Sequence, residues 1–425
     1  MNMPDSAAVI TGTVYESPLE RHLAYQPGDR KRILTLDGGG VRGMITLGLL
    51  ERLEEVLAPL APEPVRFRLS HYFDLIAGTS TGAIIASGLA MGMSVNEVKN
   101  HYFRMAPDVF RTPKGLGILR ARFDATALER HLKSVFGTMT LGSDRLETGL
   151  MICCKRIDTG SPWILTNNPQ SKYWVSEDDS FKANRDYELR TVIRASTAAP
   201  YYFDPALIVV NEGGKFPRQV GLFVDGAMGG HNTPTVQAIL TATLPAYGFC
   251  WALERDKMLM ISLGTGWWRM RHDPAAFMRK SNLMKARDVA ASMVQDSSLS
   301  ALMVMQALSE PRKPWTINSE LGDQAGESLT MGESLVFQRF DASLEADDVT
   351  RALNLGLLDG MRLPLILERL RQLDNGSAKN LRDLYAIGLE AGRTKTPGKD
   401  GIETDDFPAA FDPEGWKRPV APRSA

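Results

Sequence analysis

Phe73-Asp-Leu-Ile-Ala-Gly-Thr-Ser-Thr-Gly-Ala-Ile-Ile-Ala86 combines, within fourteen residues, an apolar strand, a tight turn and the first turns of a helix. The turn carries G-x-S-x-G as Gly78-Thr-Ser-Thr-Gly82, with Ser80 at its centre. A serine on such a strand-to-helix turn is a candidate nucleophile, because unpaired amide N–H groups and the positive end of the helix dipole lie beside it. The two glycines would let strand and helix approach closely. The motif also fits an ordinary structural junction, since Gly, Ser and Thr are common turn residues.

A glycine-rich loop lies upstream of this turn. Arg32-Ile-Leu-Thr-Leu-Asp37 is strand-like, Gly38-Gly-Gly-Val-Arg-Gly43 follows, and a helical pattern then runs to Leu57. Exposed backbone N–H groups in such a loop can bind an anion, either a dinucleotide phosphate or the oxyanion of an acyl-transfer reaction. The dinucleotide hypothesis needs an acidic residue at the end of a second strand about 20 residues later. That region is the proline-rich stretch 59–68, which favours the oxyanion hypothesis.

An aspartate ends a third apolar strand, Gly221-Leu-Phe-Val-Asp225, and Gly226-Ala227 follows it. The carboxyl ends of strands face the crevice in which α/β sheets bind their ligands, so Asp225 is a candidate for the same site as Ser80. The structural alternative is that Asp225 forms an Asp-Gly turn and caps the helix expected from about Pro234.

Taken together, Asp37-Gly-Gly-Gly-Val-Arg-Gly43, Gly78-Thr-Ser-Thr-Gly82 and Asp225-Gly-Ala227 resemble the motifs of the patatin-like phospholipase family. The resemblance extends over about residues 30–310. It implies an α/β fold, a three-layer α/β/α sandwich with a central and mostly parallel sheet, and a C-terminal helical extension.

The resemblance also implies the chemistry and the residues that perform it. Ser80 would be the nucleophile and Asp225 the general base of a dyad that cleaves acyl esters of lipids, without a cofactor. The oxyanion site would comprise Gly38, Gly39, Gly40 and Arg42. The motif positions that support them are Gly43, Gly78, Gly82, Gly226 and Ala227.

Other interpretations remain open at this point. His231 follows Asp225 in the chain order of a Ser–Asp–His triad, although only six residues separate the two. The same acyl-serine could pass its acyl group to an alcohol, as in an acyltransferase. The fold could also serve a signal-activated enzyme that degrades membranes, or a lipid-binding protein without catalysis. The substrate expected throughout is a phospholipid or another acyl lipid, and an activator is possible.

Composition is that of a globular protein, with 44% hydrophobic and 23% charged residues. The net charge of −1 gives no broad electrostatic footprint for nucleic acid. The first ten residues lack the pattern of a signal peptide, and the uncharged stretches 75–95 and 226–253 are interpreted as buried core. We therefore expect a cytoplasmic protein that contacts the membrane surface transiently.

Cysteine and histidine spacing argues against a metal site. Cys153 and Cys154 are adjacent, Cys250 lies in apolar surroundings, and all three are expected to be buried free thiols. The six histidines show no H-x-x-x-H spacing, so no structural metal is predicted.

Four segments are expected along the chain: an N-terminal arm at 1–30, the catalytic core at 31–270, a helical remainder at 271–393 and an irregular tail at 394–425. Residues 107–122 mix basic and apolar side chains, as a surface loop or a lid would. Methionines at 284, 293, 303 and 305 fit either core or a lipid-binding surface. Helices are predicted at 44–57, 81–91, 95–105, 123–136, 187–199, from 234, at 273–310 and at 347–393, and strands at 32–37, 148–156, 162–166, 220–225, 257–262 and 334–340.

Overall fold

The computed structural model describes residues 15–111, 121–309, 313–317, 322, 324, 326–329, 332, 334–359, 362–396 and 399–418. Of the segment considered as a loop or lid, residues 112–120 therefore lie outside the description.

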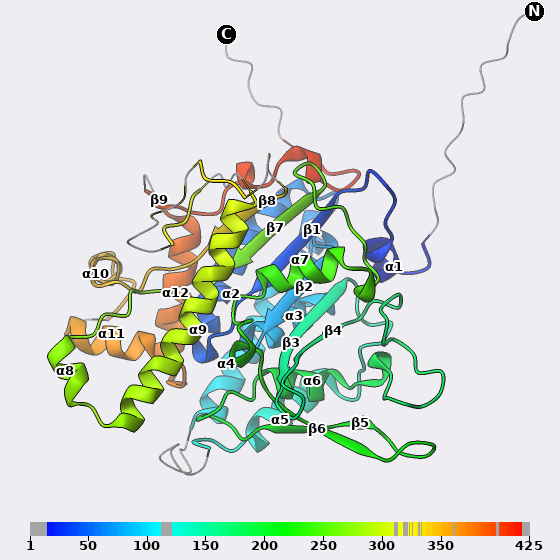
Figure 1. The fold of residues 1–425 in the computed structure, drawn as a ribbon. Helices are drawn as coiled ribbons and strands as arrows, with labels where there is room; N and C mark the ends of the chain where they lie inside the picture. The colour runs from blue at the N-terminus through cyan, green and yellow to red at the C-terminus, as the bar shows by residue number, and fades with distance from the viewer. Residues whose placement is uncertain are drawn as a thin grey trace, which may run out of the picture.

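A central sheet organises the described chain, and its strands run in the order β5-β6-β3-β2-β1-β7-β8, with β4 paired to β3 (Figure 1). Pairing is parallel from β3 through β2, β1 and β7 to β8, whereas β4, β5 and β6 pair antiparallel. The strands are β1 (Lys31–Leu36), β2 (Leu75–Thr79), β3 (Gly149–Arg156), β4 (Pro162–Thr166), β5 (Ala206–Asn211), β6 (Gln219–Asp225), β7 (Met258–Leu263) and β8 (Val336–Phe340). A separate two-stranded ladder joins β9 (Lys395–Thr396) to β10 (Lys399–Asp400).

Helices cover both faces of this sheet. The helices of the described chain are α1 (Pro18–Leu23), α2 (Gly43–Leu57), α3 (Thr81–Ala90), α4 (Val95–Val109), α5 (Thr126–Phe136), α6 (Leu189–Ser196), α7 (Thr235–Thr243), α8 (Pro274–Arg279), α9 (Asn282–Ala307), α10 (Ala346–Asn354), α11 (Leu363–Arg371) and α12 (Ala378–Arg393). The predicted α/β/α sandwich with a mostly parallel sheet is confirmed.

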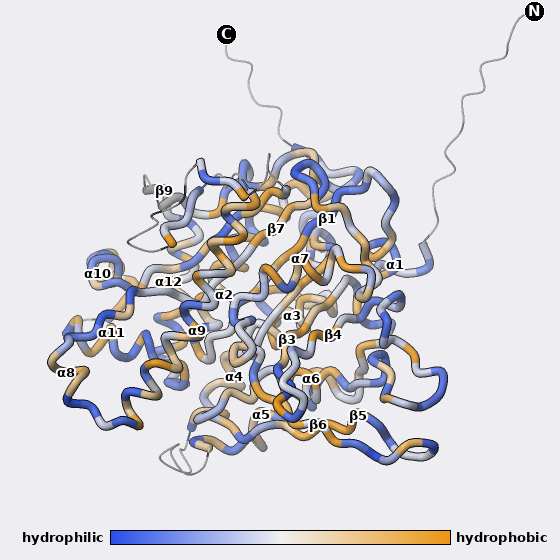
Figure 2. Tube along the Cα trace, in the orientation of Figure 1, coloured by the Kyte–Doolittle hydropathy of each residue, from blue (hydrophilic) through white to orange (hydrophobic). Residues whose placement is uncertain are grey.

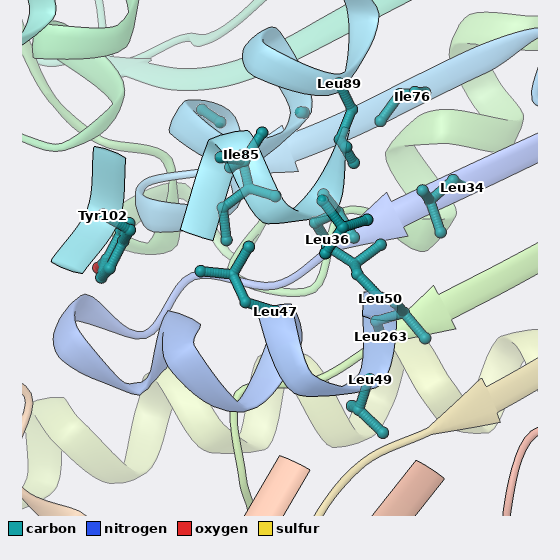
Figure 3. Packing of buried hydrophobic residues seen from close by; sticks show 14 of the residues in the cluster. Leu34, Leu36, Leu47, Leu49, Leu50, Ile76, Ile85, Leu89, Tyr102 and Leu263 are labelled. Atoms are coloured by element: carbon teal, nitrogen blue, oxygen red, sulfur yellow. The ribbon is translucent and has the colours of Figure 1, made fainter. Parts of the chain in front are cut away.

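The core is divided by the sheet because neighbouring side chains on a strand point to opposite faces. Along β1, Leu34 and Leu36 join the cluster under α2 and α3, whereas Ile33 joins the cluster under α7 and α9. β2 and β7 are fully buried, which explains why the central strands are continuously apolar rather than alternating (Figure 2). Figure 3 shows Leu36 of β1, Leu47 of α2 and Ile85 of α3 close together in the first of these clusters.

Several predicted boundaries are wrong, each for a local reason. The helix expected at 273–310 is two helices, because Lys280 ends α8 and the Ser281 hydroxyl caps α9. The helix expected at 347–393 is three, separated by a left-handed Gly356 and by the cap at Ser377. The helix expected at 123–136 begins at Thr126, whose amide donates to the Asp124 carboxylate.

Two further expectations concern single side chains. Cys250 is exposed and not buried, because its loop turns it outward with a φ of 51°. The described part of the C-terminal tail contains β9, β10 and two short 3-10 turns, and Phe407 and Phe411 anchor it in the core. Trp416 packs at its other end against Tyr72.

Among the described residues, none of the helices combines the length and the apolar character that a membrane span requires.

Candidate active site

Ser80 occupies a strained turn between β2 and α3. Its φ and ψ are 55° and −122°, a conformation that a non-glycine residue holds only when the surroundings impose it. One such constraint comes from α6, because the Ser80 amide donates to the Ser196 hydroxyl at 2.8 Å and that hydroxyl donates to the Cys153 carbonyl oxygen at 2.7 Å. The turn therefore presents the Ser80 side chain at the carboxyl end of the parallel strands.

The glycines on either side permit the close approach of strand and helix. A Cβ on Gly78 would lie 2.2 Å from the Gly82 carbonyl oxygen, and a Cβ on Gly82 would lie 2.2 Å from the Leu36 carbonyl oxygen. Gly43 meets α3 in the same way, since a Cβ there would lie 2.1 Å from Thr81 Cγ2. Backbone and packed side chains surround these positions, so any larger residue would displace the turn.

Strand register brings Asp225 to Ser80. β3 lies between β2 and β6, pairing Thr79 with Cys153 on one side and Cys154 with Asp225 on the other. The chain then turns at Gly226, where a Cβ would lie only 2.5 Å from the Cys153 carbonyl oxygen.

Asp225 is a buried carboxyl whose surroundings favour the neutral form. Burial raises the pKa of Asp225 to about 6. Hydrogen bonds from Ser80 and from the Ala227 amide oppose this rise. The Ala227 N–H lies 2.9 Å from Asp225 Oδ1. A carboxylate with this pKa is a stronger base than ordinary aspartate and is still ionised near pH 7.

The glycine loop after β1 faces this pair with two uncommitted amides. The Gly38 N–H donates to the Asn232 carbonyl oxygen at 3.0 Å. Within the described part of the chain, the amides of Gly39 and Gly40 have no protein acceptor. A Cβ on Gly38 would lie 3.3 Å from Ser80 Cβ, so the loop runs directly past the serine.

Neighbouring side chains hold the carbonyl groups of the loop. Tyr102 and Thr81 donate to the Gly40 carbonyl oxygen at 2.6 and 2.9 Å, and Thr265 donates to that of Gly38 at 2.9 Å. Gly40 has a φ of 56°, which favours glycine. With its carbonyls bound elsewhere, the loop keeps the remaining amides preorganised for an anion.

Arg42 contacts the turn that follows β7. Its guanidinium lies 4.8 Å from the centre of the Trp268 ring and donates to the Gly266 carbonyl oxygen at 3.3 Å. Burial lowers the pKa of Arg42 to about 10, so the side chain is charged at neutral pH. Arg42 thus adds positive charge behind the loop, while its hydrogen bond is to the β7 turn and not to Ser80.

His231 lies near Ser80 and Asp225, and its side chain forms no hydrogen bond to either residue. Its Nε2 is buried and has no hydrogen-bond partner among the described residues. Burial lowers the pKa of His231, and the charge of Lys155 lowers it further. Its carbonyl oxygen accepts a hydrogen bond from Thr79 at 2.5 Å. These contacts give His231 a place in the wall of the site and do not link it to Asp225.

A buried ionic cluster ties the first motif to β8. Arg339 donates to both carboxylate oxygens of Asp37, at 3.0 and 2.7 Å, and to Asp341 at 2.8 Å. Thr233 adds a hydrogen bond to Asp37 at 2.8 Å. Burial lowers the pKa of Arg339, but the charges of Asp37 and Asp341 more than offset this and raise it above its ordinary value. Asp37, which directly precedes Gly38, is therefore held in place by a side chain of β8.

Sequence reasoning missed the residues that support the site. Ser196 lies in Arg194-Ala-Ser-Thr-Ala-Ala-Pro200, a stretch to which the sequence assigns no role. Arg339 is 302 positions from Asp37, so neither periodicity nor spacing could connect them. The described residues hold no group of three or more His, Cys, Asp or Glu side chains suited to a metal ion.

Comparison with known proteins gives one family. Residues 34–239 match the family model described as "Patatin-like phospholipase". The chain is 32% identical over 181 residues to a protein named cGAMP-activated phospholipase from Escherichia coli (strain TW11681), covering 41% of this chain and 48% of that one. It is 30% identical over 253 residues to Patatin-17 from Solanum cardiophyllum, covering 57% and 62%. The matches thus span 48% and 62% of the lengths of these two relatives.

Solved structures show weaker similarity. VipD from Legionella pneumophila aligns with 84% of this chain and 67% of its own, at 13% identity and a TM-score of 0.32. TM-scores this low do not establish a shared fold.

Proposed function

Residues 34–239 belong to the patatin-like phospholipase family, and on that premise we propose that the protein is a serine lipid acyl hydrolase of the phospholipase A or lysophospholipase type. Its substrates in this proposal are fatty acyl esters of membrane lipids. The observation that carries it is the pairing of Ser80, on a strained turn, with a buried Asp225 whose pKa is raised to about 6. Among the described residues, no contact of His231 Nε2 offers a competing way to activate Ser80.

The reaction follows from the positions of these two groups. Ser80 Oγ attacks the ester carbonyl carbon while its proton moves to the Asp225 carboxylate. The tetrahedral intermediate collapses, the C–O bond to the lipid alcohol breaks, and Asp225 returns the proton to that alcohol. A water molecule then gives a proton to Asp225 and attacks the acyl-Ser80. Collapse of the second intermediate releases the fatty acid and restores both side chains.

The glycine loop would stabilise the negative oxygen of both intermediates. Gly39 and Gly40 supply the free N–H groups, Gly38 sets the approach of the loop to Ser80, and Arg42 adds positive charge behind it. Losing one oxyanion donor in other serine hydrolases costs roughly 3 kcal/mol of transition-state stabilisation. We therefore assign most of the rate enhancement to this loop and to the raised basicity of Asp225.

The test measures fatty acid release from mixed phospholipid vesicles. The wild type is expected to release fatty acid, and Ser80→Ala and Asp225→Asn should each lower the rate by roughly a thousandfold or more. His231→Asn is the matched control, because His231 lines the site without contacting the dyad, and it should keep most of the activity. A loss in His231→Asn as deep as that in Ser80→Ala would replace the dyad with a triad.

Activation needs a separate arm of this experiment. One relative is named for activation by cGAMP, so the assay is run with and without that cyclic dinucleotide. A fluorophosphonate probe then reports on the serine itself. Labelling of Ser80 in a protein that releases no fatty acid would show a competent enzyme lacking its activator or its substrate, whereas absence of labelling and of release in both arms would overturn the proposed function.

A further inference from the structure

The segment 269–293, which contains α8 and the first half of α9, projects from the body of the molecule (Figure 1). None of its described side chains is buried. Large apolar side chains nevertheless concentrate here and are exposed to solvent: Met270, Met278, Leu283, Met284, Val289 and Met293. Soluble proteins rarely gather so many in one short segment, and such a patch is typical of an interaction surface.

The apolar side chains of α9 form a continuous stripe. Leu283, Ala286, Val289, Ala290 and Met293 recur at a spacing of three to four residues, which places them on one side of the helix. We call these five residues the α9 stripe. All five are exposed, and Met293 keeps 66% of its possible accessible surface.

The polar side of the same half-helix contacts the protein instead. Asp288 forms an ion pair with Lys280 at the end of α8, and Gln295 Nε2 donates to the Trp268 carbonyl oxygen at 3.1 Å. An amphipathic helix normally packs its apolar side on the core and leaves its polar side in water. The reversed orientation leaves the α9 stripe without an apolar partner among the described residues.

Further along, α9 behaves as an ordinary core helix. Leu302 and Met305 are buried in the cluster that covers β1 and β7. The methionines of this region thus divide between the two roles considered from the sequence, with Met284 and Met293 at the surface and Met305 in the core.

Charge indicates what kind of surface the stripe meets. Residues 269–293 contain six Lys or Arg and two Asp, a net charge of +4 in a chain whose total is −1. Both acidic side chains are engaged internally, since Asp288 pairs with Lys280 and Asp273 accepts the Ala276 amide at 2.7 Å. An apolar stripe surrounded by positive charge is complementary to an anionic lipid surface, in which phosphates lie directly above acyl chains.

The position of the stripe relative to the active site completes the argument. Ser298, one turn beyond the stripe, accepts a hydrogen bond at 3.4 Å from Asn232, whose carbonyl oxygen holds the Gly38 amide. The turn of α9 that follows the stripe therefore contacts the residue that holds the loop facing Ser80.

We propose that residues 269–293 dock the protein on anionic phospholipid bilayers, with the α9 stripe inserted among the acyl chains and the basic side chains on the headgroup phosphates. This proposal rests on the proposed function for its biological purpose, because docking would bring acyl esters to Ser80. A second copy of this chain and a partner protein are the occupants that the test must distinguish.

The test is vesicle co-sedimentation, performed in a Ser80→Ala background so that no lipid is consumed. The stripe variant carries Leu283→Ser, Val289→Ser and Met293→Ser, and the matched control carries Val65→Ser, Ile157→Ser and Leu207→Ser, three exposed apolar positions elsewhere. The stripe variant should bind vesicles of phosphatidylcholine with about 30% phosphatidylglycerol at least about tenfold more weakly, whereas the control stays within about twofold. Equal thermal melting of both variants shows that the fold is intact.

A charge-reversal variant, Arg271→Glu with Arg279→Glu, separates the electrostatic part. It should bind the anionic vesicles more weakly than the parent protein does. Added salt, which weakens binding by the parent, should no longer weaken the remaining binding of the variant. Vesicle binding that is absent in the parent, or unchanged in the stripe variant, overturns the proposal. Loss of a dimer in the stripe variant with vesicle binding retained would assign the stripe to a second copy.

Catalysis is tested apart from docking, by hydrolysis of a water-soluble ester by the wild type and by Ser80→Ala. Stripe-dependent binding by a protein that neither hydrolyses this ester nor takes the fluorophosphonate label at Ser80, with or without cGAMP, would refute the proposed function and keep the docking surface. Ser80-dependent hydrolysis without stripe-dependent binding would support the proposed function and refute the docking surface.

Discussion

At the scale of single residues, the carboxyl of Asp225 is the group whose chemistry the fold changes most usefully. Its ordinary pKa of 3.8 would leave it too weak a base, and burial raises that pKa to about 6. The Ser80 hydroxyl and the Ala227 amide limit the rise, so that the carboxylate remains available at neutral pH.

This raised pKa predicts an acidic limb in the pH–rate profile. Asp225 must be ionised to accept the serine proton, so kcat/KM for a water-soluble ester should fall about tenfold per pH unit below an apparent pKa of about 6. Initial rates across the range from mildly acidic to mildly alkaline pH measure it. A profile that stays flat well below the raised pKa would mean that Asp225 is not the base.

The same pKa has a consequence for stability that provides an independent readout. Because the folded protein binds the Asp225 proton more tightly than the unfolded chain does, ionising this group costs stability as pH rises from about 4 through about 6. Asp225→Asn removes that cost and should stabilise the fold at about pH 8 by up to about 3 kcal/mol, a gain that fades toward about pH 4. Urea unfolding at both pH values checks it, and a gain that does not depend on pH would point to a different cause.

At the scale of elements, the packing of α12 on α2 supports the glycine loop after β1, since α2 begins at Gly43 directly after that loop. Glycines allow the two helices to touch through their backbones. A Cβ on Gly388 would lie 2.1 Å from the Ile45 carbonyl oxygen, and a Cβ on Gly48 would lie 2.4 Å from the Leu389 amide nitrogen.

Gly388→Ala is therefore expected to destabilise the protein by about 2–3 kcal/mol, because the added methyl group meets backbone that cannot move alone. Without this contact the substitution would stabilise a helix by about 1 kcal/mol. The sign of the change in unfolding free energy therefore shows whether the close backbone contact exists. Denaturant unfolding measures it. Arg382→Gly, at an exposed position of the same helix, calibrates the helix propensity and should cost about 1 kcal/mol.

At the scale of the whole molecule, distant parts of the chain meet at the site. The family match ends at residue 239, yet β7 and β8 complete the sheet beyond it and Arg339 of β8 neutralises Asp37. The motifs of the candidate site thus depend on a part of the chain beyond the family match.

Arg339→Met should expose this dependence. It leaves Asp37 and Asp341 buried without their cation, which typically costs about 3–5 kcal/mol, and it should lower activity by loosening the loop after Asp37. Arg351→Met provides the control, because the exposed Arg351 pairs with the half-buried Asp348 at the helix surface, and such a pair is worth about 0–1 kcal/mol. Comparable unfolding free energies for the two variants would show that the buried cluster contributes little.

The local features of the candidate site could be predicted from the sequence. The strand–turn–helix around Ser80, the glycine loop at Gly38–Gly40 and the strand ending in Asp225 each carry their own pattern, because turns and strand ends depend on nearby residues. The order of these motifs indicated the family and, through it, the sandwich fold. The starts of α9 and α12 were harder to predict. In the sequence, the capping residues Ser281 and Ser377 cannot be distinguished from other polar residues on a helix.

Only the tertiary structure decided which side chains support the site and which face outward. Ser196 binds the Ser80 amide and Arg339 binds Asp37, each from a distant part of the chain. Such contacts produce no periodic pattern in the sequence. The pKa of Asp225 depends on burial, which is a property of the packed molecule. In the sequence, the α9 stripe is a helix face that could be core, and only its placement shows that this face lies in solvent, because hydrophobic periodicity predicts a helix side without telling what covers it.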